Sequence, residues 1–234
     1  LGGRYSVLSY FGLVPAAVFG LDVVKLIDRA DQMRGKTQPG VAAHDNPGAW
    51  LGAVMGALSQ KGRDKLILVT SPAISSFGLW VEQLIAESTG KEGLGIIPVA
   101  GEPMLSPKHY GDDRLFVYLR LEGDDNAEND EAINEIEVSG HPVVCLELRD
   151  IYDIGAEFFR WEMATAVAGS ILGINPFDQP NVQAAKDMTE SVLGQFESSG
   201  KLPAMEDSAS ISKLLEMVAP GDYLVIMAYV LQTP

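Results

Sequence analysis

Lys65-Leu66-Ile67-Leu68-Val69-Thr70 is a short run with apolar residues at consecutive positions, and Ser71 and Pro72 follow it as residues that start helices. Strands exposed on one face alternate apolar and polar side chains, whereas strands of parallel sheets are covered by helices on both faces and read as continuous apolar runs. The stretch at residues 65–70 therefore predicts a buried strand of a parallel sheet.

Further apolar runs follow along the chain, and each is short enough for a single strand. They are residues 95–99, 115–119, 142–148 and 223–230. Helical patterns lie before or between these runs, with apolar side chains that recur at helical spacing. They cover residues 50–58, 77–85 and 158–172, with Asn46 and Pro47 as a start signal and Gly90 and Gly173 as stops. Alternating strands and helices predict an α/β fold, a three-layer α/β/α sandwich with a mostly parallel five-stranded sheet.

The charge and composition exclude several classes of protein. The net charge is −15, which repels nucleic acid, and no basic stripe offsets it. Residues 7–26 are rich in apolar side chains, but they contain Pro15 and Asp22, and an Asp at the centre of a membrane costs about 2.5–3.5 kcal/mol. We therefore expect a buried helix there, and no membrane partner.

The single cysteine, Cys145, lies in the apolar run at residues 142–148, so we expect a buried and inert thiol. One cysteine allows neither a disulfide within the chain nor a paired-cysteine metal site, which is consistent with a reducing cytoplasm. The glycine-rich phosphate-binding motifs of nucleotide-binding proteins are absent from the sequence. Ligands of open parallel sheets gather at the carboxyl ends of strands, but the fold alone leaves the function open.

Three segments together resemble the glucose-6-phosphate isomerase family. Residues 2–12, GGRYSVLSYFG, are similar to its Gly-Gly-Arg signature. Residues 87–91, ESTGK, are similar to its Glu-Ser-x-Gly-Lys segment, and residues 173–186, GINPFDQPNVQAAK, to its Gly-Ile-Asn signature. Finer similarities, at residues 46–52, 62–66 and 221–223, indicate the branch in which the isomerase is fused behind a transaldolase.

The resemblance implies a reaction without a cofactor or metal, in which glucose 6-phosphate and fructose 6-phosphate interconvert through a cis-enediol. It implies that Glu87 is the base that moves a proton between C2 and C1, and that Arg4 lies near the enediolate oxygens. Lys186 would assist ring opening. Gln179 would lie near the sugar phosphate, and Gly3 and Lys91 would contribute to substrate binding.

Each of these residues also has an ordinary structural interpretation. The Gly2-Gly3 pair is compatible with a flexible leader, and Arg4 with a surface charge. Glu87 and Lys186 are compatible with solvated positions on helices, and Lys91 could satisfy carbonyls at a helix end. The competing hypothesis for the whole chain is a binding module without catalysis. It would be built on the same sugar-isomerase (SIS) domain, which has a flavodoxin-like fold.

The sequence also departs from the family's pattern. The family's Ser- and Thr-rich phosphate loop lies in a preceding sugar-isomerase domain, and Ser71 to Ser76 read only as a helix start. The family's histidine, which follows an Asp-Arg pair in many relatives, is replaced here by Leu115, and His44, His109 and His141 suit loop or turn positions. We therefore expect residues 1–234 to be one sugar-isomerase domain that lacks an upstream domain and a C-terminal tail. The family further implies a homodimer for the full-length protein.

Overall fold

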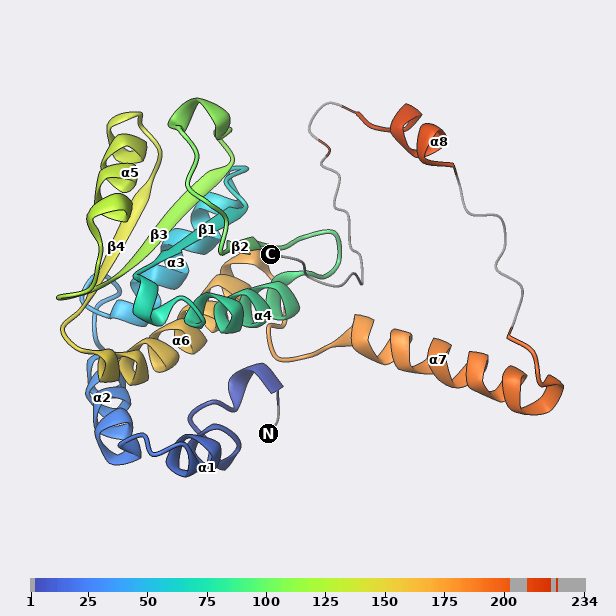
Figure 1. The fold of residues 1–234 in the computed structure, drawn as a ribbon, viewed down its shortest axis with the longest axis horizontal. Coiled ribbons are helices and arrows are strands. Elements are labelled where there is room, and N and C mark those ends of the chain that lie inside the picture. Colours follow the sequence, from blue (N-terminus) through green and yellow to red (C-terminus); the bar gives the residue numbers. More distant parts are fainter. Residues whose placement is uncertain (1–2, 203–209, 220–221, 223–234) are drawn as a thin grey trace. The chain divides into compact units, whose positions relative to one another are not determined.

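The computed structural model describes residues 3–202, 210–219 and 222. Of these described residues, those up to Asn181 form one compact unit, and those from Val182 onward form a second one. Figure 1 shows the strands and helices of the first unit. Its short 3-10 helices are η1 (Gly3–Tyr5), η2 (Pro72–Ile74), η3 (Pro107–His109) and η4 (Ile151–Asp153).

The first unit contains a parallel sheet of four strands in the order β2-β1-β3-β4. The strands are β1 (Lys65–Thr70), β2 (Ile97–Ala100), β3 (Arg114–Leu121) and β4 (Val143–Leu148). Lys65 is in register with Ile97 on one side and with Arg114 on the other. The prediction of a parallel α/β sheet is confirmed, and the predicted fifth strand at residues 223–230 lies outside the described residues.

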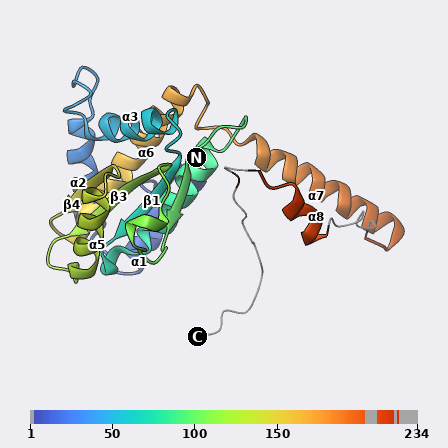
Figure 2. The same cartoon turned by 90° about the horizontal axis from the view of Figure 1, so that it is seen from above.

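The two faces of the sheet carry separate apolar cores. Leu66 and Leu68 of β1 face a core shared with α3, α4 and α6, whereas Ile67 and Val69 face a smaller core shared with α5. Figure 2 shows the strands between α5 on one side and the neighbouring helices α3 and α6 on the other. The helices of this unit are α1 (Tyr10–Val18), α2 (Val23–Lys36), α3 (Pro47–Ser59), α4 (Phe77–Thr89), α5 (Ala127–Val138) and α6 (Ile154–Leu172).

The ends of the predicted helices follow local capping chemistry. The side chain of Asn46 accepts a hydrogen bond from the Ala49 amide and Pro47 is the first helical residue, which starts α3. Gly173 adopts a left-handed backbone conformation, φ 76°, and ends α6. Gly52 of α3 lies so close to Ala164 of α6 that a β-carbon there would be 2.4 Å from the Ala164 carbonyl oxygen.

The prediction of a buried helix over residues 7–26 was wrong. The segment divides at Phe19–Asp22 into α1 and the start of α2, and Asp22 caps α2. None of the residues of α1 is buried against the described part of the chain, and Tyr10 and Phe19 are 84% and 85% exposed. The apolar composition of this segment thus forms a surface instead of a core.

Cys145 is exposed, contrary to prediction. Its strand, β4, lies at the edge of the four-stranded sheet, and burial alternates along it. Val144 and Leu146 enter the large core, whereas Cys145 and Glu147 lie on the opposite face. On this face α5 is the helix that the structure describes, and it makes few contacts with β4. The side chains of β4 on this face are therefore exposed.

The described helices of the second unit are α7 (Pro180–Ser199), which begins at the boundary between the units, and α8 (Ile211–Glu216). Among the described residues, no helix of either unit is both long enough and apolar enough to cross a membrane.

Candidate active site

Arg4 and Glu87, which are far apart in the sequence, form an ion pair in the first unit. The NH1 atom of Arg4 lies 3.0 Å from Oε1 of Glu87. Glu87 belongs to the last turn of α4, which leaves the carboxyl end of β1 and runs back toward the start of β2. The pair therefore lies at the amino ends of the strands, and not at the carboxyl ends, where the general rule for open sheets places ligands.

The guanidinium group of Arg4 is buried, with 2% of its surface exposed, and four groups surround it. Its Nε donates to the hydroxyl of Ser88 at 2.7 Å, and its NH2 donates to the carbonyls of Pro176 at 2.9 Å and Asp178 at 3.1 Å. A planar guanidinium with five donors can serve all of these acceptors at once. The interpretation of Arg4 as a surface charge is thereby excluded.

Glu87 connects this buried cluster with the surface. Its side chain is 25% exposed, so the carboxylate reaches solvent although its partner does not. Oε1 faces Arg4, and Oε2 lies 3.5 Å from the side-chain amide of Gln83, one turn earlier on the same helix. A carboxylate that is oriented by a fixed cation and accessible on its other side has the geometry required of a base that meets a bound substrate.

Tyr5 extends the polar cluster beside Arg4. Its hydroxyl lies 3.1 Å from the hydroxyl of Ser88 and 3.4 Å from the Pro176 carbonyl. Burial raises the pKa of the Tyr5 hydroxyl, while the hydrogen bond with Ser88 and the positive charge of Arg4 act in the opposite direction. The Tyr5 hydroxyl is consequently a neutral hydrogen-bonding group at physiological pH.

Lys91 holds the loop that follows α6. Its ammonium group donates to the carbonyls of Asn175 at 2.6 Å and Asp178 at 3.0 Å, and it also pairs with the Asp178 carboxylate at 2.5 Å. A lysine ammonium has three donors, so these acceptors use all of them. The Lys91 side chain thus binds this distant loop, and not the carbonyls at the end of its own helix, which was the ordinary interpretation of its position.

The same loop reaches Arg4 because the chain turns sharply after α6. Gly173 takes the left-handed conformation, and the amide of Ile174 then donates to the carbonyl of Gly169 at 3.0 Å. Pro176 packs against Gly169 so closely that a β-carbon on this glycine would lie 2.9 Å from the proline ring. The two glycines thus bring the carbonyls of residues 175–178 to Arg4 and Lys91.

The structure places the other predicted site residues as follows. Gly3 begins η1 with φ 71°, and its carbonyl accepts hydrogen bonds from the amide and the hydroxyl of Ser6. Gln179 is exposed and directly follows Asp178 in the loop. Lys186 is an exposed residue of α7 and belongs to the second unit. The roles of these three residues stay predictions.

His44 lies in a loop and His141 just before a strand, as their sequence positions indicated, whereas His109 ends the short helix η3. His44 is exposed beside Asp45, and His109 is exposed beside Ser106. The ring of His141 packs against Phe116, with ring centres 5.5 Å apart. Within the part of the chain that the structure describes, no group of His, Cys, Asp and Glu side chains could hold a metal ion.

Sequence reasoning did not select Ser88 and Tyr5 as site residues, although both lie in the quoted motifs. Ser88 is fully buried, and its hydroxyl joins Arg4 to Tyr5. A serine on the apolar face of α4, between the buried positions Leu84 and Ile85 and the buried Thr89, was the available signal. A polar side chain at such a position needs a hydrogen-bond partner.

Comparisons with known proteins identify relatives along most of the chain. It is 29% identical over 232 residues to glucose-6-phosphate isomerase of Leptospira biflexa, covering 83% of this chain and 52% of the relative. It is 32% identical over 230 residues to a probable glucose-6-phosphate isomerase of Methanococcus maripaludis, covering 82% of this chain and 51% of the relative. The chain is a homologue of glucose-6-phosphate isomerases. No protein-family model matches it, and the chain spans about half the length of the curated relatives.

Two solved structures share the fold of this chain. A hypothetical protein of Thermus thermophilus has a TM-score of 0.68 at 21% identity, covering 82% of this chain and 55% of the other. A glucose-6-phosphate isomerase of Chlamydia trachomatis has a TM-score of 0.66 at 15% identity, covering 84% of this chain and 48% of the other. At these identities the similarity supports the fold, and the function is argued from the site.

Proposed function

We propose that this chain is the C-terminal sugar-isomerase domain of a glucose-6-phosphate isomerase and that it contributes the catalytic base. The ion pair between Arg4 and Glu87 is the observation that carries the proposal. Two residues selected from separate motifs, with separate chemical roles, meet at 3.0 Å in the fold. The names of the homologous proteins support the same reaction class.

In the proposed reaction, Glu87 removes the proton from C2 of the open-chain sugar and returns it to C1. The negative charge that develops on the enediolate oxygens is stabilised by Arg4, whose charge does not depend on pH in the physiological range. Since Ser88, Pro176 and Asp178 already fix Arg4, the cation needs no reorganisation when this charge develops. A positioned acid–base group contributes about 10²–10⁴-fold to such a rate.

The other predicted residues surround this centre in the proposal. Lys186 assists opening of the sugar ring, Gln179 lies near the sugar phosphate, and Gly3 allows the backbone before Arg4 to approach the substrate. Lys91 was predicted to bind substrate, and its three acceptors favour a positioning role instead, in which it holds the loop that carries Gln179.

The phosphate site is proposed to lie in a preceding sugar-isomerase domain. Ser71, at the start of the loop after β1, is fully buried, and its hydroxyl already bonds the Asn126 side chain at 2.5 Å and the Leu121 amide at 2.7 Å. This hydroxyl ties β1 to β3 and is not directed at a ligand. The chain alone is therefore proposed to be inactive.

The exposed apolar side chains of α1 support an additional partner domain. Tyr10, Phe11 and Val18 of α1, and Phe19 directly after it, are each at least 70% exposed. Apolar side chains gathered on one short helix are typical of a protein–protein or domain interface. We assign this surface to the upstream domain or to the second subunit of a homodimer.

We further propose that the full-length protein belongs to the transaldolase-fused branch. Its proposed location is the cytoplasm.

A coupled isomerase assay tests the proposed function. Fructose 6-phosphate is supplied, and glucose 6-phosphate is detected through a dehydrogenase that reduces NADP⁺. The assay compares this chain with the proposed longer polypeptide and with that polypeptide carrying Glu87→Gln. We expect activity in the longer wild type alone, and a loss of at least 10²-fold with Glu87→Gln because the base is removed.

Glu82→Gln is the matched control, because it removes the same charge from the same helix and Glu82 has no hydrogen bond or ion pair with the cluster. It should retain the wild-type rate. If the longer polypeptide binds sugar phosphates but catalyses nothing, the competing hypothesis of a non-catalytic binding module replaces the enzyme. If Glu87→Gln is fully active, Glu87 is not the base.

A further inference from the structure

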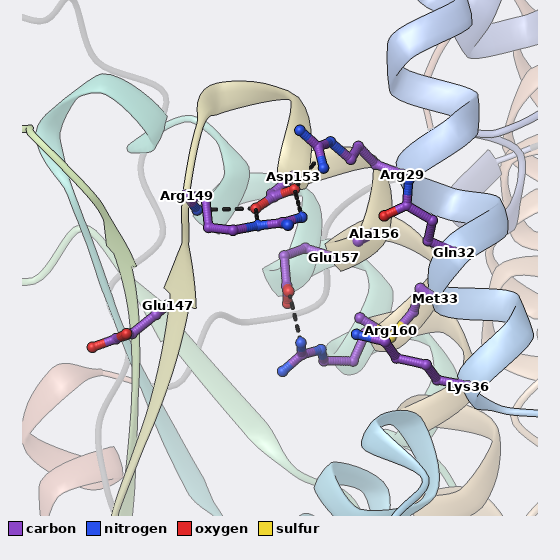
Figure 3. Close-up of a pocket in the computed structure, with 10 residues that line it drawn as sticks. All are labelled: Arg29, Gln32, Met33, Lys36, Glu147, Arg149, Asp153, Ala156, Glu157 and Arg160. Carbon is purple, nitrogen blue, oxygen red and sulfur yellow. Dashed lines mark hydrogen bonds and ion pairs between the residues drawn. The ribbon is translucent and has the colours of Figure 1, made fainter.

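A polar cavity lies away from Glu87, at the opposite end of the sheet. It has a volume of about 340 Å³ and lies between α2, the carboxyl end of β4 and the first two turns of α6. Figure 3 shows the side chains that converge on it, whereas Glu147 points away from the others. Its position agrees with the general rule that ligands of parallel sheets bind outside the carboxyl ends of strands.

Part of the charge in this cavity is satisfied within the protein. The Asp153 carboxylate binds Nε and NH2 of Arg149 at 3.0 and 2.9 Å, and it also pairs with Nε of Arg29 at 3.2 Å. The Asp150 carboxylate pairs with NH2 of Arg29 at 2.8 Å. Arg160 pairs with Oε1 of Glu157 at 3.2 Å. These contacts account for Asp153 and Arg29 as structural ion pairs that join η4 and α6 to α2.

Other polar atoms in the cavity have no partner within the described part of the chain. Oε2 of Glu157 and Nε of Arg160 are buried and have no hydrogen-bond partner among the described residues. The Glu157 side chain is only 3% exposed, and it lines the cavity. The ammonium of Lys36 also lines the cavity and has no ion pair within the described part of the chain. A buried carboxylate oxygen without a partner is costly, which makes a bound group at this position favourable.

The balance of charge selects the kind of ligand. Four cationic side chains line the cavity, Arg29, Lys36, Arg149 and Arg160, against three carboxylates, Glu147, Asp153 and Glu157. Because Glu147 points away from the other side chains, a small excess of positive charge faces the cavity in a chain whose net charge is −15. Burial, and to a lesser extent Asp153, raises the pKa of Glu157 to about 7, against the opposing effects of Arg160 and of the nearby Trp161 indole. Near neutral pH this carboxyl group can therefore donate or accept a hydrogen bond.

We propose that this cavity binds a small anion that carries hydroxyl groups, a phosphate monoester or a carboxylate. Lys36 and the free guanidinium atoms of Arg149 and Arg160 bind the anionic group, and Oε2 of Glu157 binds a hydroxyl group. The volume lies at the lower end of the range of about 300–1,000 Å³ for ligand pockets, which fits a compact metabolite. This site is separate from the proposed base, and its occupancy does not depend on the isomerase reaction.

Isothermal titration calorimetry on the chain at low ionic strength tests the proposal. The probes are glycerol 3-phosphate, D-glycerate, inorganic phosphate and uncharged glycerol. We expect saturable binding of at least one hydroxylated anion and none of glycerol. Comparison of the first two probes distinguishes a phosphate ester from a carboxylate. Lys36→Gln should weaken binding about tenfold, since a hydrogen bond to a charged group contributes about 1.5 kcal/mol or more.

Arg34→Gln is the matched control, because Arg34 is an exposed cation of the same helix that pairs with Asp31 and does not line the cavity. It should leave the affinity unchanged. Glu157→Gln should reduce the preference for glycerol 3-phosphate over inorganic phosphate, because the carboxyl group that meets the hydroxyl is altered. The proposal is overturned if neither hydroxylated anion binds, or if Lys36→Gln and Arg34→Gln weaken binding equally. Lys36 is exposed, so its variant should fold even if Glu157→Gln does not.

Discussion

NH1 of Arg4 lies 3.0 Å from Oε1 of Glu87, and the buried partner of this pair is the arginine. The same guanidinium bonds the Pro176 and Asp178 carbonyls. One side chain thus joins η1, the last turn of α4 and the loop after α6. The orientation of Glu87 and the position of that loop therefore depend on a common cation.

Replacing Arg4 by lysine should destabilise the first unit by about 2–3 kcal/mol, although the charge is retained. A lysine ammonium has three donors on a flexible stem and cannot reach Ser88, Glu87 and both carbonyls in one geometry. Urea unfolding of the wild type and the variant, with a fluorescence readout, measures the difference.

Arg34→Lys provides the control for this substitution, because Arg34 is 55% exposed and forms a surface ion pair with Asp31. We expect a change within about 0.5 kcal/mol there. Equal stability of Arg4→Lys and the wild type would mean that the bonds to Ser88 and the loop contribute little.

Replacing glycine by alanine should change the stability in opposite directions at two helix positions. Gly52→Ala should destabilise the protein by about 3 kcal/mol, because its β-carbon would lie 2.4 Å from the Ala164 carbonyl and 2.7 Å from Val167. Gly35→Ala should stabilise it by up to about 1 kcal/mol, since Gly35 is in α2 with no atom near its β-carbon position. Thermal unfolding of both variants checks the signs. A neutral Gly52→Ala would mean that α3 and α6 can separate at no cost.

Stability should fall as the pH rises through the titration of Glu162. Burial raises the pKa of this carboxyl group from 4.5 to about 7. The folded state therefore binds a proton that the unfolded state has released between these values, so stability present at pH 4.5 is lost by pH 7. The loss is about 2 kcal/mol, allowing for partial exposure. Urea unfolding at about pH 5 and about pH 8, on either side of this window, measures it.

Glu162→Gln keeps the shape of the side chain and cannot ionise, so its stability relative to the wild type should increase with pH. Glu157 titrates in the same window and leaves the variant with part of the slope. Glu131→Gln, at an exposed position on α5, is the control and should differ from the wild type equally at both pH values. Parallel pH profiles of Glu162→Gln and the wild type would contradict the assignment.

The four described strands and the helices α3, α4 and α6 could be predicted from the sequence because local patterns determine them. The run at residues 65–70 is β1 at the same residues, and the helix predicted to end at Gly90 ends at Thr89. Burial could not be predicted where it depends on neighbouring elements. The apolar residues of α1 are exposed, and Cys145 faces outward because its strand is at an edge.

At the candidate site, too, some features could be predicted from the sequence and others could not. The motifs identified Arg4, Glu87 and Lys91, since these residues are recognisable by type and order. The partners of Lys91 could not be predicted, because they are backbone carbonyls of a loop far along the chain, and a carbonyl has no sequence signature. Ser88 could in principle have been predicted as a site residue, because it is a polar residue on a buried helix face.

Lys91 should stabilise the loop after α6 mainly through backbone carbonyls and less through its ion pair. Lys91→Met removes the bonds to the Asn175 carbonyl, the Asp178 carbonyl and the Asp178 carboxylate, and leaves three part-buried acceptors without their donor, which should cost about 3 kcal/mol. Asp178→Asn removes only the charge of a side chain that is 49% exposed, which should cost less than about 1 kcal/mol. Urea unfolding gives both values, and amide hydrogen exchange should accelerate at residues 174–179 in Lys91→Met alone. If Asp178→Asn is as destabilising as Lys91→Met, the ion pair holds the loop, and the carbonyl contacts follow from it.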